Sequence, residues 1–79
     1  MTLRSGLVLV DRLGIYDHDG VSTQGVYSGQ VLGLGRMVKS RRLNWARIET
    51  PEQYRGLWVA TGPVGDPQQW ISYDERNDE

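Results

Sequence analysis

The sequence predicts a mainly β domain, folded as a small, partly open barrel of five to six short strands with one helical turn near residues 51–55. Two observations carry this expectation. Short runs rich in Val, Ile, Trp and Tyr recur along the chain, and Gly, Pro, Asp and Ser separate them at close intervals. No long segment has the period of about 3.6 residues that an amphipathic helix requires. The pattern is typical of SH3-like and OB-like barrels, an architecture that carries no function by itself.

The length of 79 residues suits one domain, which we expect over residues 1–73, with an acidic flexible tail at 74–79. The chain has no cysteine, which excludes disulfides and thiolate metal sites and fits a cytoplasmic protein. No apolar run approaches the roughly 20 residues that span a bilayer, so no membrane association is expected. Phe is absent, whereas three Trp and four Tyr are present, and these residue types suit interfaces as well as cores.

The first half of the chain is expected to form a hairpin that leads into a long, bent strand. Residues 7–10 are continuously apolar, as in a buried strand, and a bulge is expected at Gly14. Residues 17–20 read Asp-His-Asp-Gly, which predicts a type I′ hairpin turn. The central strand is expected over residues 25–38. Four glycines within eleven residues predict a bulge or sharp bend in it.

Shorter strands are expected to follow and to pack back on the central one. The basic residues at 39–42 predict a polar turn. Within residues 43–49, a strand would place Trp45 on one face and Ile48 on the other, and we favour this strand over the alternative of a short helix. Residues 57–61 are apolar and predict the next strand, and residues 68–73 predict the last one, after a loop rich in Gly and Pro.

One helical turn is expected between the late strands. Thr50 suits the N-cap and Pro51 the first helical position. Gln53 stands where it completes a capping box, and Gly56 suits the left-handed conformation that ends such a turn.

No catalytic residue, metal site or cofactor is expected. His18 is the single histidine, and it stands in the predicted turn with too few neighbouring ligands for a metal. A nucleophilic serine needs a base beside it, and the chain has no Gly-x-Ser-x-Gly elbow.

Three short pieces resemble segments of the plasmid-borne dihydrofolate reductases that are built as SH3-like barrels. The pieces are Gly-Gln-Val-Leu-Gly at 29–33, Thr-Pro-Glu-Gln-Tyr at 50–54 and Gln-Trp-Ile-Ser-Tyr at 69–73. The family reads Gly-Gln-(Ile/Val)-Val-Gly, then Thr-x-Glu-Gly-Tyr, then a catalytic Val-Gln-Ile-Tyr run. In this chain Gln69 and Tyr73 are separated by three residues, so the catalytic run is not preserved. The resemblance implies the fold and not the activity.

Charge is distributed unevenly, although the net charge is only −1. Residues 36–55 contain six basic and two acidic residues, whereas residues 56–79 contain one basic and five acidic residues. One interpretation is a solvated surface whose two blocks partly neutralise each other. The other is a binding patch, because Trp, Tyr and Arg are enriched at protein interfaces. The candidate binding residues are Arg36, Lys39, Arg41, Arg42, Trp45, Arg47, Tyr54 and Arg55.

We expect a small non-catalytic binding module, similar to an adaptor or inhibitor, that docks on a protein partner through this Arg/Trp/Tyr patch. One alternative is binding of single-stranded nucleic acid, because Arg and Lys bind phosphates and aromatic rings stack on bases. Another is a small-molecule enzyme with its site at an oligomer interface. A homodimer is expected, because a small cysteine-free core is marginal and residues 57–61 suit an exposed sheet edge.

Overall fold

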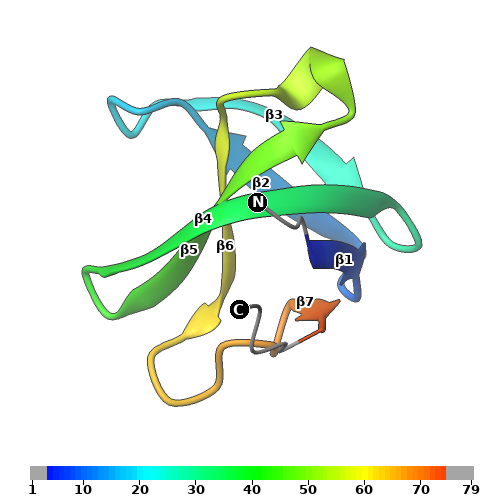
Figure 1. The fold of residues 1–79 in the computed structure, drawn as a ribbon. Helices are drawn as coiled ribbons and strands as arrows, with labels where there is room; N and C mark the ends of the chain where they lie inside the picture. The colour runs from blue at the N-terminus through cyan, green and yellow to red at the C-terminus, as the bar shows by residue number, and fades with distance from the viewer. Residues whose placement is uncertain (1–3, 75–79) are drawn as a thin grey trace, which may run out of the picture.

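The computed structural model describes residues 4–74, which form seven strands and one short 3₁₀ helix (Figure 1). The domain is therefore mainly β, as the sequence predicts. The elements are β1 (Arg4–Val8), β2 (Arg12–Tyr16), β3 (Ser22–Tyr27), β4 (Val31–Ser40), β5 (Leu43–Thr50), η1 (Glu52–Tyr54), β6 (Trp58–Pro63) and β7 (Ile71–Tyr73).

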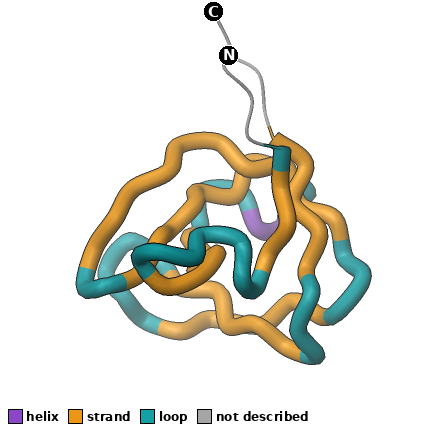
Figure 2. The backbone as a smooth tube through the Cα atoms, turned by 90° about the horizontal axis from the view of Figure 1, so that it is seen from below, coloured by secondary structure: helices purple, strands orange, loops and turns teal. Residues whose placement is uncertain are grey.

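All seven strands belong to one antiparallel sheet, in the order β3-β2-β6-β5-β4-β1-β7. The sheet is strongly curled, and Figure 2 shows the strands running around the domain rather than lying in a flat layer. The amide of Trp70, just before β7, donates to the carbonyl of Thr61 in β6 at 2.8 Å. This hydrogen bond links two parts of the chain that are not neighbours in the sheet order.

The core lies inside the curl and is built from alternate residues of the strands, because successive side chains of a strand point to opposite faces. In β5, for example, Ala46 and Ile48 are fully buried while Arg47 between them is exposed. The same alternation occurs in β1, where Val8 is buried but Leu7 is 41% exposed. The expectation of a continuously buried run at 7–10 is therefore wrong. The buried apolar cluster comprises Val8, Ile15, Val26, Leu32, Leu34, Ala46, Ile48, Tyr54, Val59 and Ile71.

The expected central strand at 25–38 is in fact two strands. β3 ends at Tyr27, and the chain turns through Gly29, which has a φ of +90°, before β4 begins. Gln30 closes this turn, since its amide donates to the carbonyl of Tyr27 at 3.1 Å and its side-chain oxygen accepts from the amide of Tyr27 at 2.7 Å. The glycine that predicted a bend thus produces a complete reversal.

Both expected irregularities exist, but one lies elsewhere. The bend expected within the glycine-rich run is confirmed in β4, where the register against β5 shifts between residues 33 and 37. The bulge expected at Gly14 is wrong, because Gly14 pairs regularly with Gly25. The shift instead falls between Ile15 and Tyr16, where β3 contributes the additional residue.

The hairpin turn expected at 17–20 is confirmed, but its type is not I′. Of these four residues Gly20 alone has a positive φ, +84°. The carboxylate of Asp17 organises the loop by accepting from the amides of Asp19 and Val21, each at 2.9 Å. The loop is therefore a longer hairpin connection that uses glycine in the left-handed region.

The polar turn expected at 39–42 and the strand preferred for 43–49 are both confirmed. Ser40 at the end of β4 pairs with Leu43 at the start of β5, so Arg41 and Arg42 form a two-residue hairpin loop. Both arginines have positive φ, +53° and +68°. This is the φ combination of a type I′ turn, made by two residues that lack the freedom of glycine.

The helical turn is confirmed as η1, and Gly56 follows it with a φ of +87°. The expected capping is wrong. Thr50 is the last residue of β5, Pro51 holds the cap position after a cis peptide bond, and no side chain caps the helix.

The apolar strand expected at 57–61 is confirmed as β6, but it is not at an edge, since β2 and β5 pair with it on either side. The strand expected at 68–73 is shortened to β7. Of the expected tail at 74–79, Asp74 is exposed and the rest lies outside the described residues. None of the helical structure within residues 4–74 is long and apolar enough to cross a membrane.

Candidate binding cleft

Three aromatic residues lie on the outer face of the sheet. Trp45 and Trp58 point away from the core because their neighbours Ala46 and Val59 are buried in it. Tyr16, at the end of β2, is the cross-strand partner of Trp58 and therefore shares its face. All three side chains are half-buried. Antiparallel pairing through β6 thus gathers aromatic residues from three separate parts of the chain.

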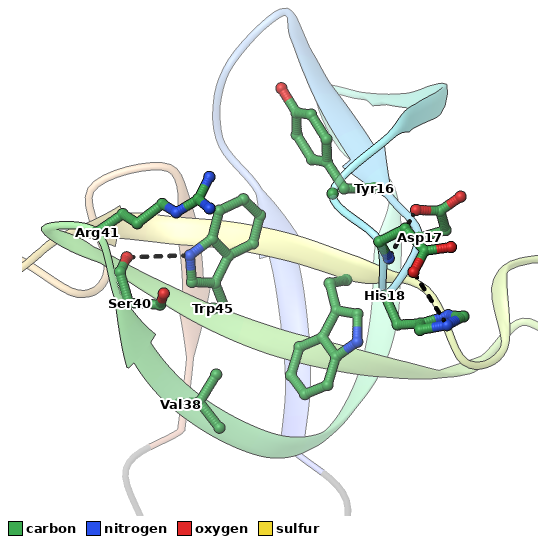
Figure 3. A pocket seen from close by; sticks show the side chains of 10 residues that line it. Tyr16, Asp17, His18, Val38, Ser40, Arg41 and Trp45 are labelled. Atoms are coloured by element: carbon green, nitrogen blue, oxygen red, sulfur yellow. Dashed lines mark hydrogen bonds and ion pairs between the residues drawn. The ribbon is translucent and has the colours of Figure 1, made fainter.

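These rings line a cleft of about 280 Å³ (Figure 3). The ring of Tyr16 meets the indole of Trp45 edge-on, with centroids 5.5 Å apart and an interplanar angle of 89°. Trp45 is held in place by its indole N–H, which donates to the carbonyl of Ser40 at 3.3 Å. The residues lining the cleft are Tyr16, Asp17, His18, Asp19, Gly20, Val38, Ser40, Arg41, Trp45 and Trp58.

The two sides of the cleft carry opposite charge. The β2–β3 hairpin supplies Asp17 and Asp19 on one side, whereas the β4–β5 hairpin supplies Arg41 on the other. Figure 3 shows Asp17 and His18 on the side opposite to Arg41, with Trp45 next to Arg41. The carboxylate of Asp19 lies 3.4 Å from Nε2 of His18, and both side chains are largely exposed to solvent. The aromatic floor is thus bounded by an acidic rim and a basic rim.

The structure brings together four of the eight sequence-predicted binding residues. Arg41 and Trp45 both line the cleft, and Arg42 is exposed beside Arg41 in the same turn. Lys39 lines a second cleft of about 330 Å³, which shares Trp45 as a wall and also contains Tyr73. The β4–β5 hairpin therefore carries the part of the predicted patch that adjoins an aromatic surface.

The other four predicted residues do not line the aromatic cleft, although Arg47 is the cross-strand partner of Trp58. Arg47 and Arg55 are engaged with Glu49, at 3.5 Å and 3.9 Å between their Nε atoms and its carboxylate oxygens. Arg36 is exposed in the bend of β4 and lines neither cleft. Tyr54 was expected to contact a partner, but it is only 7% exposed and packs in the core from η1. Tyr54 is the one buried residue of η1, and its side chain anchors the helical turn on the core.

Sequence reasoning missed Tyr16, Trp58 and the acidic rim. Tyr16 and the acidic rim are distant from the basic block in sequence, and only the pairing of β6 with both β2 and β5 places them beside it. Trp58 comes three residues after the end of that block. One signal was available for Trp58. Successive side chains of a strand point to opposite faces, so Trp58 faces away from the core if its apolar neighbour Val59 faces into it.

The cleft offers two kinds of interaction to a ligand. Its ring faces provide flat apolar contact, and tryptophan and tyrosine retain a polar end for hydrogen bonding. The indole N–H of Trp58 has no hydrogen-bond partner within residues 4–74 and is available as a donor. No group of three or more potential metal ligands occurs in the described part of the chain.

No protein-family model, no curated protein and no solved structure matches the chain. Of the residues that carry the resemblance to the reductases, Gln69 lines neither cleft, whereas Tyr73 lines the second one.

Proposed function

We propose that this domain is a non-catalytic binding module that docks on a protein partner by holding an extended segment of that partner in the aromatic cleft. The convergence of Tyr16, Trp45 and Trp58 on one outer face carries the proposal. Aromatic-lined grooves suit extended, proline-containing segments, because such segments lose little conformational entropy on binding and pack flat against rings. The free indole N–H of Trp58 supplies a donor for a peptide carbonyl.

The finer architecture that we propose is a partly open barrel of the SH3-like or OB-like kind. The strong curl of the sheet and the hydrogen bond from Trp70 to Thr61 support it. The absence of cysteine supports a cytoplasmic location.

The test is selection of short random peptides on the immobilised domain, followed by titration of the selected peptides. Binding in the cleft is expected to change the fluorescence of Trp45 and Trp58. Trp45→Ala and Trp58→Ala are expected to lose most of the affinity, since buried aromatic anchors dominate interfaces. Tyr27→Ala is the matched control, because Tyr27 is an aromatic residue that is 57% exposed and lies outside the cleft. Equal affinity of all variants for the selected peptides would contradict the proposal.

Single-stranded nucleic acid is the rival ligand. The grouping of Lys39, Arg41 and Arg42 on the hairpin beside Trp45 favours it. The acidic rim of Asp17 and Asp19 opposes it, because carboxylates repel phosphates. Labelled oligonucleotides in a salt series separate the two proposals. Affinity that falls steeply with salt supports nucleic-acid binding, whereas no binding at low salt removes it.

Self-association as a homodimer is the second proposal about partners. Residues 57–61 offer no free edge for it, because β6 is paired on both sides. A different feature supports the dimer, namely the cross-strand pair of Leu7 and Val31, which are 41% and 61% exposed. Two exposed aliphatic side chains directly opposite each other form an apolar surface that a two-fold copy would cover.

A further inference from the structure

The turn between β4 and β5 has a backbone conformation that does not suit its residues. Arg41 and Arg42 have φ values of +53° and +68°. In this region the Cβ atom of an L-residue approaches the following carbonyl oxygen, which is why type I′ turns strongly prefer Asn-Gly. A pair of arginines therefore makes this turn less stable than Asn-Gly would. Backbone strain of this kind clusters at functional sites.

Neighbouring groups hold the turn in this conformation. The carbonyl of Ser40 accepts from the indole N–H of Trp45 at 3.3 Å, and the carbonyl of Arg42 accepts from the amide of Val64 at 3.0 Å. Both arginine side chains remain exposed, and Arg41 lines the aromatic cleft. The strained turn therefore presents the Arg41 guanidinium at the edge of the aromatic floor, with Arg42 exposed next to it in the turn.

The opposite rim has the complementary chemistry. Asp17 uses one carboxylate oxygen to hold its hairpin loop, accepting from two backbone amides at 2.9 Å. Asp19 is exposed and lies beside His18 at the same rim. A segment that crosses the cleft therefore meets a cationic group on one side, aromatic rings in the middle and carboxylates on the other side.

We propose that the cleft selects partner segments by charge polarity. The ligand is a peptide with an acidic residue at one end, an apolar or proline-containing centre and a basic residue at the other end. Its carboxylate pairs with Arg41 and Arg42, since guanidinium groups bind carboxylates in a bidentate manner. Its basic residue lies at Asp19. This polarity also fixes the direction of the segment in the cleft. The inference rests on the proposed peptide-binding function and adds the ligand's charge pattern to it.

The experiment compares peptide selections on four forms of the whole domain: wild type, the double variant Arg41→Asn/Arg42→Gly, Asp19→Asn, and Arg36→Ala as a control for loss of an arginine elsewhere. We expect peptides selected on wild type to carry the acid–apolar–base pattern. Peptides selected on the double variant are expected to lose the acidic residue and keep the basic one. Peptides selected on Asp19→Asn are expected to lose the basic residue and keep the acidic one. The best wild-type peptide should bind each of these two variants about two- to fivefold more weakly, the range for exposed ion pairs.

Circular dichroism and thermal unfolding establish that each form is folded. If the double variant is not folded, the single variant Arg41→Gln replaces it in the comparison. Selected peptides with no charge preference, or with the same preference in the double variant, would overturn the charge-polarity inference and leave peptide binding intact. Selected peptides that bind Trp45→Ala as well as wild type, or no enrichment at all, would overturn both proposals.

Discussion

Tyr16 and Trp45 meet edge-on across a strand that separates them. Their ring centroids are 5.5 Å apart and their planes make an angle of 89°, although β6 lies between β2 and β5 in the sheet. Edge-to-face contact places the positive ring edge against the negative ring face, which is a favoured arrangement for aromatic pairs. The contact therefore links β2 and β5, whose hairpins form the two sides of the cleft.

We predict that this ring pair contributes measurable coupling to the stability of the fold. A double-mutant cycle with Tyr16→Ala and Trp45→Ala, measured by urea unfolding, should give a coupling of about 0.5–1.5 kcal/mol. Tyr16→Phe keeps the ring and should lose little, because the phenol hydroxyl is not part of the contact geometry. Strict additivity of the two alanine substitutions would show that the rings do not interact in solution.

The second prediction concerns the strained hairpin. Arg41→Asn/Arg42→Gly should raise the free energy of unfolding by about 1–2 kcal/mol, because it removes part of the left-handed penalty of two L-residues. The control Arg36→Ala changes an exposed arginine in an extended strand and should stay within about 0.5 kcal/mol of wild type. Thermal or urea unfolding measures both. A double variant less stable than wild type would mean that the arginine side chains themselves stabilise the turn.

The third prediction concerns the close approach of two backbone segments at Gly62. A Cβ atom there would clash with the carbonyl oxygen of Asp66 and lie 3.0 Å from the amide of Gln69. Gly62→Ala must therefore displace backbone and should destabilise the domain by more than about 2 kcal/mol. Gly14→Ala is the matched control, since its nearest neighbour is a ring atom of Tyr16 at an ordinary 3.6 Å. Comparable stability of the two variants in urea would contradict this close packing of the β6–β7 loop against β6.

The fourth prediction concerns self-association. Sedimentation equilibrium at low micromolar concentration is expected to give a dimer for wild type. Leu7→Lys and Val31→Lys should each give a monomer, because a charge in the middle of the proposed contact would be buried without a partner. Val64→Lys alters another exposed aliphatic residue, at 51% exposure in the β6–β7 loop, and should leave the dimer intact. A wild-type mass that stays monomeric at every concentration rules the homodimer out.

Much of the local structure follows from short-range chemistry. Asp17 and Gly20 specify a hairpin loop. The Asp17 carboxylate accepts hydrogen bonds from two backbone amides, and Gly20 adopts a positive φ. Gly56 ends the helical turn in the same way. The alternation around Ala46 and Ile48 specifies a strand with one buried face. These features depend on a few adjacent residues, so their signals are visible in a linear reading.

Other features could not be predicted from the sequence, because contacts with a distant segment of the chain override the local preference. Gly29 favours both a kink in one strand and a reversal between two, and the pairing of β4 with β1 selects the reversal. Thr50 is a good helix cap by its chemistry, yet it ends β5 and pairs with Gly33 instead. Tyr54 is an equally plausible surface or core residue until the position of η1 against the core is known.

The sequence by itself determines that this chain is a mainly β domain, where most of its turns lie and which hairpin carries exposed arginines, because each depends on residue chemistry within a few positions. Only the tertiary structure decides that Tyr16 and Trp58 join Trp45, and that Asp17 and Asp19 face Arg41. The physical reason is the curl of the sheet around β6. Strand pairing is a long-range interaction. Side chains from different strands come together on one surface only when the order of the strands is fixed.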